Sequence, residues 1–191
     1  MGGLKGSKAC VAGFEAIGKE VAKLFKANEI DGLVFDPFVK NEVIREMGYT
    51  PVDSFDELVS EVRFLTLHMP SAPETRKMLG EKQFKLMRKG VFLVNCARGD
   101  IVDEDALYDA LVDGAVAGAA VDVMEAEPMD PGHKLFTLPN FIATAHSAAQ
   151  TREAYEGVGK MVSDGVIAVL SGERWPKVFN PEAYDHPRWN K

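Results

Sequence analysis

Residues 9–18 read Ala-Cys-Val-Ala-Gly-Phe-Glu-Ala-Ile-Gly, and this stretch has the composition of a phosphate-binding turn. The small and apolar residues 9–12 predict a short buried strand, which Gly13 ends. Apolar residues then recur at helical spacing from Ile17 onward, so we expect a helix directly after the turn. The free N–H groups and the positive dipole end at the start of such a helix can hold a phosphate.

Glu15 occupies the middle position of this turn. Residues 13–18 resemble the G-x-G-x-x-G pattern of dinucleotide-binding turns, in which the middle glycine lets the backbone approach the phosphates. Two like charges about 4 Å apart repel by about 1 kcal/mol in water and by about 4 kcal/mol at an effective dielectric of 20. An acid at a helix start also stabilises the helix by roughly 0.3–1 kcal/mol. Glu15 can therefore stabilise the empty protein and hinder cofactor binding.

Asp36 follows a second apolar run, residues 32–35, and lies 18 residues after Gly18. Dinucleotide-binding folds place an acid near this distance, where it hydrogen-bonds the adenosine ribose. A carboxylate there repels a 2′-phosphate, so the position favours NAD over NADP. An aspartate before a proline is also common in turns, and the residue taken alone leaves both interpretations open.

Strand-like and helix-like segments alternate along the chain, which is the pattern of repeated right-handed crossovers. We expect strands at residues 9–12, 32–35, 62–67, 91–94, 116–121 and 141–144, and helices at residues 16–28, 39–47, 54–60, 81–87, 103–112 and 151–170. The continuous apolar run 91–94 is typical of a strand buried on both faces. Asp53 is a possible helix cap, and Leu107, Leu111 and Val112 are expected to face inward. The predicted fold is an α/β, doubly wound parallel sheet of the Rossmann type.

Ligands of such sheets bind at the carboxyl ends of the strands. Several polar residues lie just past the predicted strand ends: Asp36, His68, Asn95 to Arg98, Asp122 and His146. We expect them to line one rim. Taken singly, each has an ordinary explanation: Arg98 is typical of a surface loop, Glu127 of a turn before proline, and His146 of a structural histidine.

The motifs that follow the later strands occur in a specific order: Asn95-Cys96-Ala97-Arg98-Gly99, then Val102-Asp103-Glu104 with Ala106-Leu107, then Asp122-Val123-Met124-Glu125-Ala126-Glu127-Pro128, and then Ala145-His146-Ser147-Ala148. In this order and spacing they resemble the D-2-hydroxyacid dehydrogenase family, and its phosphoglycerate dehydrogenase-like members in particular. The resemblance extends from residue 4 to residue 182 and includes Leu67-His68-Met69-Pro70 with Thr75.

The resemblance implies a catalytic set of Arg98, Glu127 and His146. Arg98 is expected to bind the carboxylate of a 2-hydroxy or 2-keto acid, because a planar guanidinium suits a planar carboxylate. His146 is expected to act as general acid and base while a hydride passes to or from NAD. Glu127 is expected to hold the imidazole in orientation.

The resemblance also implies a set of NAD-binding residues. These are Gly13, Glu15, Ala16, Ile17 and Gly18 at the pyrophosphate turn, Asp36 at the ribose, Met69, Pro70 and Thr75 at the adenosine and phosphates, and Cys96, Ala97 and Asp122 at the nicotinamide.

Composition excludes several other classes of protein. The chain of 191 residues is 46% hydrophobic with a net charge of −7, so it is globular, and its charge argues against a nucleic-acid partner or an anionic membrane. No apolar run approaches the roughly 20 residues of a membrane span, and a cytoplasmic location is expected.

Cys10 and Cys96 lie in apolar runs and are expected to be buried, reduced thiols. The histidines show no ligand spacing, so no metal is assigned; His133 and His186 are expected to face solvent.

We expect one cofactor domain over residues 1–175, followed by a tail over residues 176–191 that returns to a substrate lobe. Family members fold that lobe from residues before the first strand, whereas only about eight residues precede it here; the difference is on the order of 100 residues. The resemblance also implies a homodimer formed through the cofactor domain. Two alternatives remain at this point: an idle module that dimerises or binds nucleotide weakly, and a methyltransferase-like Rossmann domain, which leaves Arg98, Glu127 and His146 unexplained.

Overall fold

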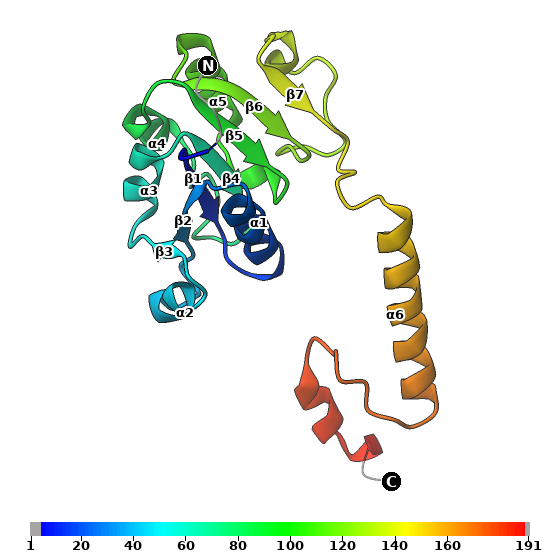
Figure 1. Cartoon of the computed structure of the whole chain (residues 1–191). Coiled ribbons are helices and arrows are strands. Elements are labelled where there is room, and N and C mark those ends of the chain that lie inside the picture. Colours follow the sequence, from blue (N-terminus) through cyan, green and yellow to red (C-terminus); the bar gives the residue numbers. More distant parts are fainter. Residues whose placement is uncertain (1–4, 190–191) are drawn as a thin grey trace. The chain divides into compact units, whose positions relative to one another are not determined.

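The computed structural model describes residues 5–189, and contacts divide the chain into two compact units, residues 1–147 and 148–191 (Figure 1). The strands of the first unit are β1 (Lys8–Ala12), β2 (Asp31–Phe35), β3 (Thr50–Pro51), β4 (Phe64–Leu67), β5 (Val91–Asn95), β6 (Val116–Val121) and β7 (Phe141–Ala143). Its helices are α1 (Ala16–Ala27), α2 (Asn41–Glu46), α3 (Phe55–Glu61), α4 (Glu81–Leu86) and α5 (Glu104–Asp113), with short 3-10 turns η1 (Gly99–Ile101) and η2 (Lys134–Thr137). The predicted boundary after residue 175 stays a prediction.

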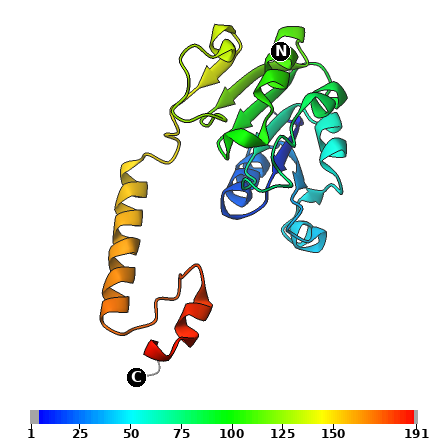
Figure 2. The same cartoon turned by 180° about the vertical axis from the view of Figure 1, so that it is seen from behind.

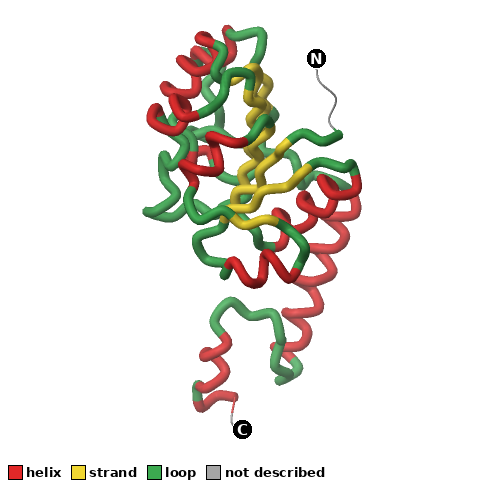
Figure 3. The backbone as a smooth tube through the Cα atoms, turned by 60° about the vertical axis from the view of Figure 1, so that its left-hand side comes forward, coloured by secondary structure: helices red, strands yellow, loops and turns green. Residues whose placement is uncertain are grey.

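The seven strands form one parallel sheet in the order β3-β2-β1-β4-β5-β6-β7, which confirms the predicted doubly wound fold. The order reverses direction between β1 and β4, the place where such folds bind their ligands. Figure 3 shows the strands, in yellow, at different angles to one another, as in a twisted sheet. The sequence did not predict β3, because two residues give no periodic signal.

Helices cover the two faces of the sheet unequally. The helices α3, α4 and α5 pack together on one face, and α1 packs against β1 and β2 on the other (Figures 1 and 2). The larger core lies beneath α3 to α5 and includes Leu65, Leu93 and Leu107, all nearly inaccessible to solvent. A smaller core under α1 includes Phe14 and Val34.

The expectation that residues 91–94 are covered on both faces is wrong. Burial alternates along β5: Val91 and Leu93 are buried, whereas Phe92 and Val94 are 39% and 40% exposed. Ile142 of β7 is also exposed, at 66%. The reason is that α1 covers β1 and β2, leaving side chains on that face of β5 and β7 exposed in this unit.

The structure corrects two further expectations, one about the residue that caps α3 and one about the buried face of α5. Ser54, not Asp53, caps α3, and its hydroxyl oxygen accepts a hydrogen bond from the Glu57 N–H at 3.1 Å. Val112 is 62% exposed, because the buried stripe of α5 consists of Leu107, Ala110 and Leu111, at the i, i+3, i+4 spacing of a helix.

The second unit consists of α6 (Arg152–Leu170) and a C-terminal segment with turns η3 (Pro181–Asp185) and η4 (Pro187–Trp189). The hydroxyl of Thr151 caps α6 by accepting from the Ala154 N–H at 3.1 Å. The Tyr184 hydroxyl accepts a hydrogen bond from the Trp175 N–H at 2.7 Å, and this contact links two parts of the C-terminal segment. None of the helices in the described part of the chain combines the length and apolarity of a membrane span.

Candidate active site

The turn between β1 and α1 keeps two of the three glycine positions of a phosphate-binding turn. Gly13 has a φ of +101°, which L side chains rarely adopt, and a Cβ on Gly18 would lie 1.9 Å from the Gly13 carbonyl oxygen. The helix therefore starts in direct contact with the turn, as the role of the third glycine requires. This backbone fits a pyrophosphate at the start of α1.

Glu15 is the N-cap residue of α1 and has an ordinary backbone conformation, with φ of −86°. Its side chain is exposed and makes no hydrogen bond or ion pair within residues 5–189. Ala16 and Ile17 of the first helical turn are also exposed. The conformation at position 15 thus does not require glycine, and what a glutamate changes is the space and charge in front of the helix.

Asp36 lies past the end of β2, but its carboxylate binds the protein backbone. Oδ2 accepts from the Phe14 N–H at 2.6 Å, and Oδ1 accepts from the Phe38 and Val39 N–H groups at 2.7 and 3.1 Å. The side chain is 9% exposed and joins the glycine turn to the loop after β2. Since a carboxylate has about four acceptor positions, one remains for a ribose hydroxyl.

The loop after β4 carries Met69, Pro70 and Thr75. Met69 and Thr75 are buried and Pro70 is exposed. The Thr75 hydroxyl donates to the Pro70 carbonyl at 2.7 Å and accepts from the Ala72 N–H at 2.9 Å. Thr75 therefore fixes the shape of this loop, and its predicted role toward the cofactor remains a prediction.

His68, at the start of the same loop, gives a prediction for the pH dependence of stability. Burial lowers the pKa of its imidazole, whose Nε2 lies 2.9 Å from the Thr66 hydroxyl. As the pH falls below about 6.5, the unfolded chain binds the proton first, so the free energy of unfolding decreases. Urea denaturation at about pH 7.5 and pH 5.5 should show a smaller loss for His68→Gln than for the parent. Equal losses would contradict this assignment.

Asn95 holds the loop that carries Arg98. The buried Asn95 amide donates to the Arg98 carbonyl at 2.9 Å, and its oxygen accepts from the Ala97 N–H at 3.0 Å. The Arg98 side chain is exposed, and its Nη1 donates to the Ala97 carbonyl at 2.6 Å. The sequence placed Asn95 on the rim without assigning it this role.

Cys96 is exposed, which corrects the expectation that both thiols are buried; Cys10 is buried as expected. Side chains of β5 alternate, so Cys96 follows Phe92 and Val94 on the uncovered face. Partial burial and, secondarily, the nearby Asp122 carboxylate raise the pKa of the Cys96 thiol.

Because only the thiolate reacts, we expect iodoacetamide to label Cys96 more slowly than glutathione at the same pH. Half of the maximal rate should be reached at a higher pH than for glutathione. Mass spectrometry of native Cys96→Ser should find no label, and one label should appear after unfolding. Labelling of native Cys10 would contradict the burial of that thiol.

Asp122 organises the segment that carries His146. Its Oδ1 accepts from the Thr144 hydroxyl and from the Ser147 N–H, the latter at 2.9 Å. The His146 N–H donates to the Asp122 carbonyl at 2.8 Å. His146 has a φ of +50°, a conformation that non-glycine residues adopt mostly where the surrounding structure holds them, and often at functional sites.

Glu127 and His146 are brought together by the fold. Glu127 Oε2 lies 2.8 Å from His146 Nδ1, and both side chains are partly exposed. A carboxylate accepts from Nδ1–H, which leaves Nε2 as the ring nitrogen able to exchange a proton with a ligand. The two residues lie 19 positions apart in sequence and come from the loops after β6 and β7.

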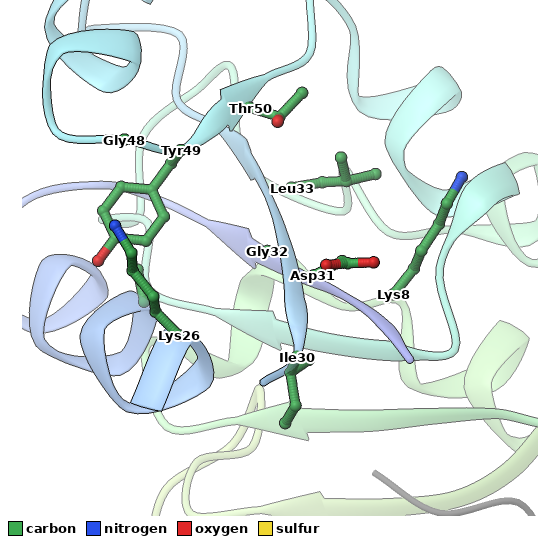
Figure 4. Close-up of a pocket in the computed structure, with 10 residues that line it drawn as sticks. Lys8, Lys26, Ile30, Asp31, Gly32, Leu33, Gly48, Tyr49 and Thr50 are labelled. Atoms are coloured by element: carbon green, nitrogen blue, oxygen red, sulfur yellow. The ribbon is translucent and has the colours of Figure 1, made fainter. Parts of the chain in front are cut away.

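A pocket of about 440 Å³ lies elsewhere in the unit, near the starts of β1, β2 and β3 (Figure 4). Lys8, Lys26, Asp31 and Tyr49 are among its lining residues, and it contains none of the predicted site residues. Within residues 5–189, no cluster of three or more His, Cys, Asp or Glu side chains is suited to a metal ion.

Residues 1–148 match the model of the D-isomer specific 2-hydroxyacid dehydrogenase family, NAD binding domain. The chain belongs to this family. Membership excludes the methyltransferase-like alternative and accounts for the glycine turn, the parallel sheet and the rim of polar loops as parts of an NAD-binding domain.

The members of the D-2-hydroxyacid dehydrogenase family that this chain resembles are considerably longer than the chain itself. D-3-phosphoglycerate dehydrogenase of Methanocaldococcus jannaschii is 41% identical over 93% of this chain and 34% of its own length. Glyoxylate reductase of Thermococcus litoralis is 38% identical over 94% of this chain and 54% of its own length. The NAD complex of a D-isomer specific 2-hydroxyacid dehydrogenase from Lactobacillus delbrueckii ssp. bulgaricus superposes with a TM-score of 0.82 at 32% identity, over 91% of this chain and 56% of that one. The chain thus spans about a third to a half of these relatives.

Proposed function

We propose that this chain is the cofactor half of an NAD-dependent oxidoreductase that acts on the CH–OH group of a D-2-hydroxy acid, and in reverse on a 2-keto acid. The observation that carries the proposal is the hydrogen bond between Glu127 and His146 on the rim of an NAD-binding domain. A carboxylate that orients an exposed imidazole is the arrangement expected of a general acid and base.

Each of the three side chains has a distinct role in this proposal. The exposed Arg98 guanidinium, on the loop that Asn95 fixes, binds the substrate carboxylate through its fork of N–H groups. During oxidation, His146 Nε2 accepts the hydroxyl proton, and it returns a proton to the oxygen during reduction. Glu127 keeps the Nδ1–H tautomer and stabilises the imidazolium that forms. NAD supplies the hydride acceptor, and NADH the hydride donor.

The residues proposed to hold NAD follow the rim. The backbone at Ala16 and Ile17 faces the pyrophosphate, the remaining acceptor position of Asp36 takes the adenosine ribose, and Asp122 with the Cys96 and Ala97 backbone lies at the nicotinamide. The retained backbone of the Gly13 turn and the buried carboxylate at position 36 support this assignment. An acid at position 36 predicts a preference for NADH over NADPH.

Fluorescence titration with NADH and NADPH, followed by an assay of NADH consumption with glyoxylate and other 2-keto acids, tests the proposal. We expect weak NADH binding, weaker NADPH binding and little turnover by the 191-residue chain. A mock purification from cells that lack the expression plasmid identifies contaminating activity, and His146→Ala is assayed in parallel. Binding of NADPH that equals or exceeds that of NADH would contradict the role of Asp36, and turnover retained by His146→Ala would contradict the catalytic assignment.

A catalytically idle module that dimerises or binds nucleotide weakly is the second candidate, and Glu15 favours it. Its carboxylate, which has no partner within residues 5–189, lies at the start of α1, where the pyrophosphate is expected. Steady turnover of a 2-hydroxy or 2-keto acid would exclude this candidate. A cytoplasmic location remains part of either proposal, in keeping with two free cysteines.

A homodimer through the cofactor domain also belongs to the proposal. The exposed Phe92, Val94 and Ile142 form part of a sheet face that parallel sheets normally bury. We expect light scattering after size-exclusion chromatography to give twice the mass of the chain. A monomer at micromolar concentration would contradict it.

A further inference from the structure

Glu104, at the first position of α5, binds two separate parts of the loop that carries Glu127. Its Oε1 accepts from the Glu125 N–H at 2.7 Å, and its Oε2 lies 3.3 Å from His133 Nε2. The Glu104 side chain is only 14% exposed. One carboxylate thus joins two points of the loop that lie eight residues apart.

A hydrogen bond of the His133 ring agrees with this contact. Its Nδ1 accepts from the Leu135 N–H at 3.4 Å, which places the ring proton on Nε2, the nitrogen that lies 3.3 Å from Glu104 Oε2. The expectation that His133 faces solvent is wrong, because its side chain is 25% exposed and contacts α5. Sequence reasoning found no role for Glu104 or His133, since their partners are 21 and 29 residues away from Glu104.

Glu127 lies between these two points of attachment. Within residues 5–189, His146 is the partner of its carboxylate, and the side chain is 38% exposed. Nothing else that the structure describes holds this carboxylate at 2.8 Å from the imidazole. The position of the loop backbone must therefore be set by contacts such as those of Glu104.

We infer that Glu104 is the positioning residue of the proposed active site: it anchors the Glu125 N–H and His133, and so holds Glu127 against His146. The inference rests on the proposed function, because it concerns the same Glu127 and His146 pair. A bond from a backbone N–H to a carboxylate is about twice as strong as one between neutral groups, which suits it to anchoring a partly exposed loop.

Imidazole ¹⁵N NMR of His146 tests this without any need for turnover, because the ring shifts report which nitrogen carries the proton. The parent should show protonated Nδ1, and Glu127→Gln should lose that signature. Glu104→Asp keeps the charge but is one methylene shorter, so we expect loss of the signature and about 10- to 100-fold faster exchange of the Glu125 amide proton. Glu104→Gln keeps the reach and one accepting oxygen, which can serve the Glu125 N–H, so it should retain the slow exchange and the signature although its NH₂ group cannot accept from His133. Asp109→Ala, on the exposed side of α5, is the matched control and should change neither.

The outcomes separate this inference from the proposed function. Loss of the signature in Glu127→Gln together with its full retention in Glu104→Asp would overturn the positioning role alone. An unchanged signature in Glu127→Gln would overturn the Glu127 and His146 pair and the positioning role with it. If Glu104→Asp and Glu104→Gln both lose the protonated Nδ1 signature while Asp109→Ala keeps it, the result supports the positioning role. It would also show that this role requires the negative charge of Glu104.

Discussion

Replacing Glu15 by glycine is expected to increase the affinity for NADH by about 5- to 150-fold, which corresponds to about 1–3 kcal/mol. Glu15 is the N-cap of α1, its side chain is exposed, and it has no partner within the described residues. A cofactor phosphate at the helix start therefore meets an unpaired negative charge. The glycine variant removes both the charge and the Cβ from the approach to the backbone.

Glu15→Gln separates the two contributions. It keeps the bulk of the side chain and removes the charge, so a gain equal to that of Glu15→Gly assigns the effect to repulsion. A gain confined to Glu15→Gly assigns it to crowding. Fluorescence titration at low and high salt adds a second criterion, because the repulsive part is screened by ions.

Adenosine is the matched ligand control, since it lacks the pyrophosphate. Its affinity should not differ between the parent and Glu15→Gly. If the parent binds NADH in the micromolar range and Glu15→Gly changes nothing, the Glu15 side chain points away from the phosphates in the complex. The idle module then loses its main support.

Replacing Gly99 by alanine is expected to lower the free energy of unfolding by about 1–3 kcal/mol. A Cβ at this position would lie 2.0 Å from the carbonyl carbon and oxygen of Met124 and 2.5 Å from the Glu125 nitrogen. Both neighbours are backbone, so the loop before Glu127 has to move as a whole. Urea denaturation followed by circular dichroism measures the change.

Gly32→Ala is the control for this substitution. Its Cβ would lie 3.9 Å from Tyr49 Cδ1, an ordinary van der Waals separation. We expect the stability of Gly32→Ala to stay within about 0.5 kcal/mol of the parent. If Gly99→Ala and Gly32→Ala have equal free energies of unfolding, the loop after β6 moves to accommodate the new Cβ without loss of stability, and the prediction is wrong.

Local patterns were sufficient for most of the fold. Small and apolar runs gave β1, β4, β5 and β6, and helical spacing gave α1 and α6 to within a residue or two. The two-residue strand β3 escaped prediction because its pairing with β2 is a tertiary contact. Phe92 and Val94 were expected to be buried because an apolar run does not reveal whether a helix covers each face.

For the candidate site too, some features were predictable from sequence motifs and others were not. The order of Arg98, Glu127 and His146 among the strands indicated the family, and the family match confirms it. The hydrogen bond from the Phe14 N–H to Asp36 and the anchoring contacts of Glu104 with Glu125 and His133 join residues more than 20 positions apart, and no local pattern encodes them.

The sequence by itself determined the parallel α/β fold, the family and the cofactor class, because periodicity, glycine turns and ordered motifs are properties of neighbouring residues. Only the tertiary structure decided that Glu127 lies within hydrogen-bond distance of His146, that the β5 face is exposed and that Cys96 is accessible. The physical reason is that these hydrogen bonds and this burial depend on distances between segments that are remote in sequence. Those distances are set by the tertiary fold and cannot be read from local sequence patterns.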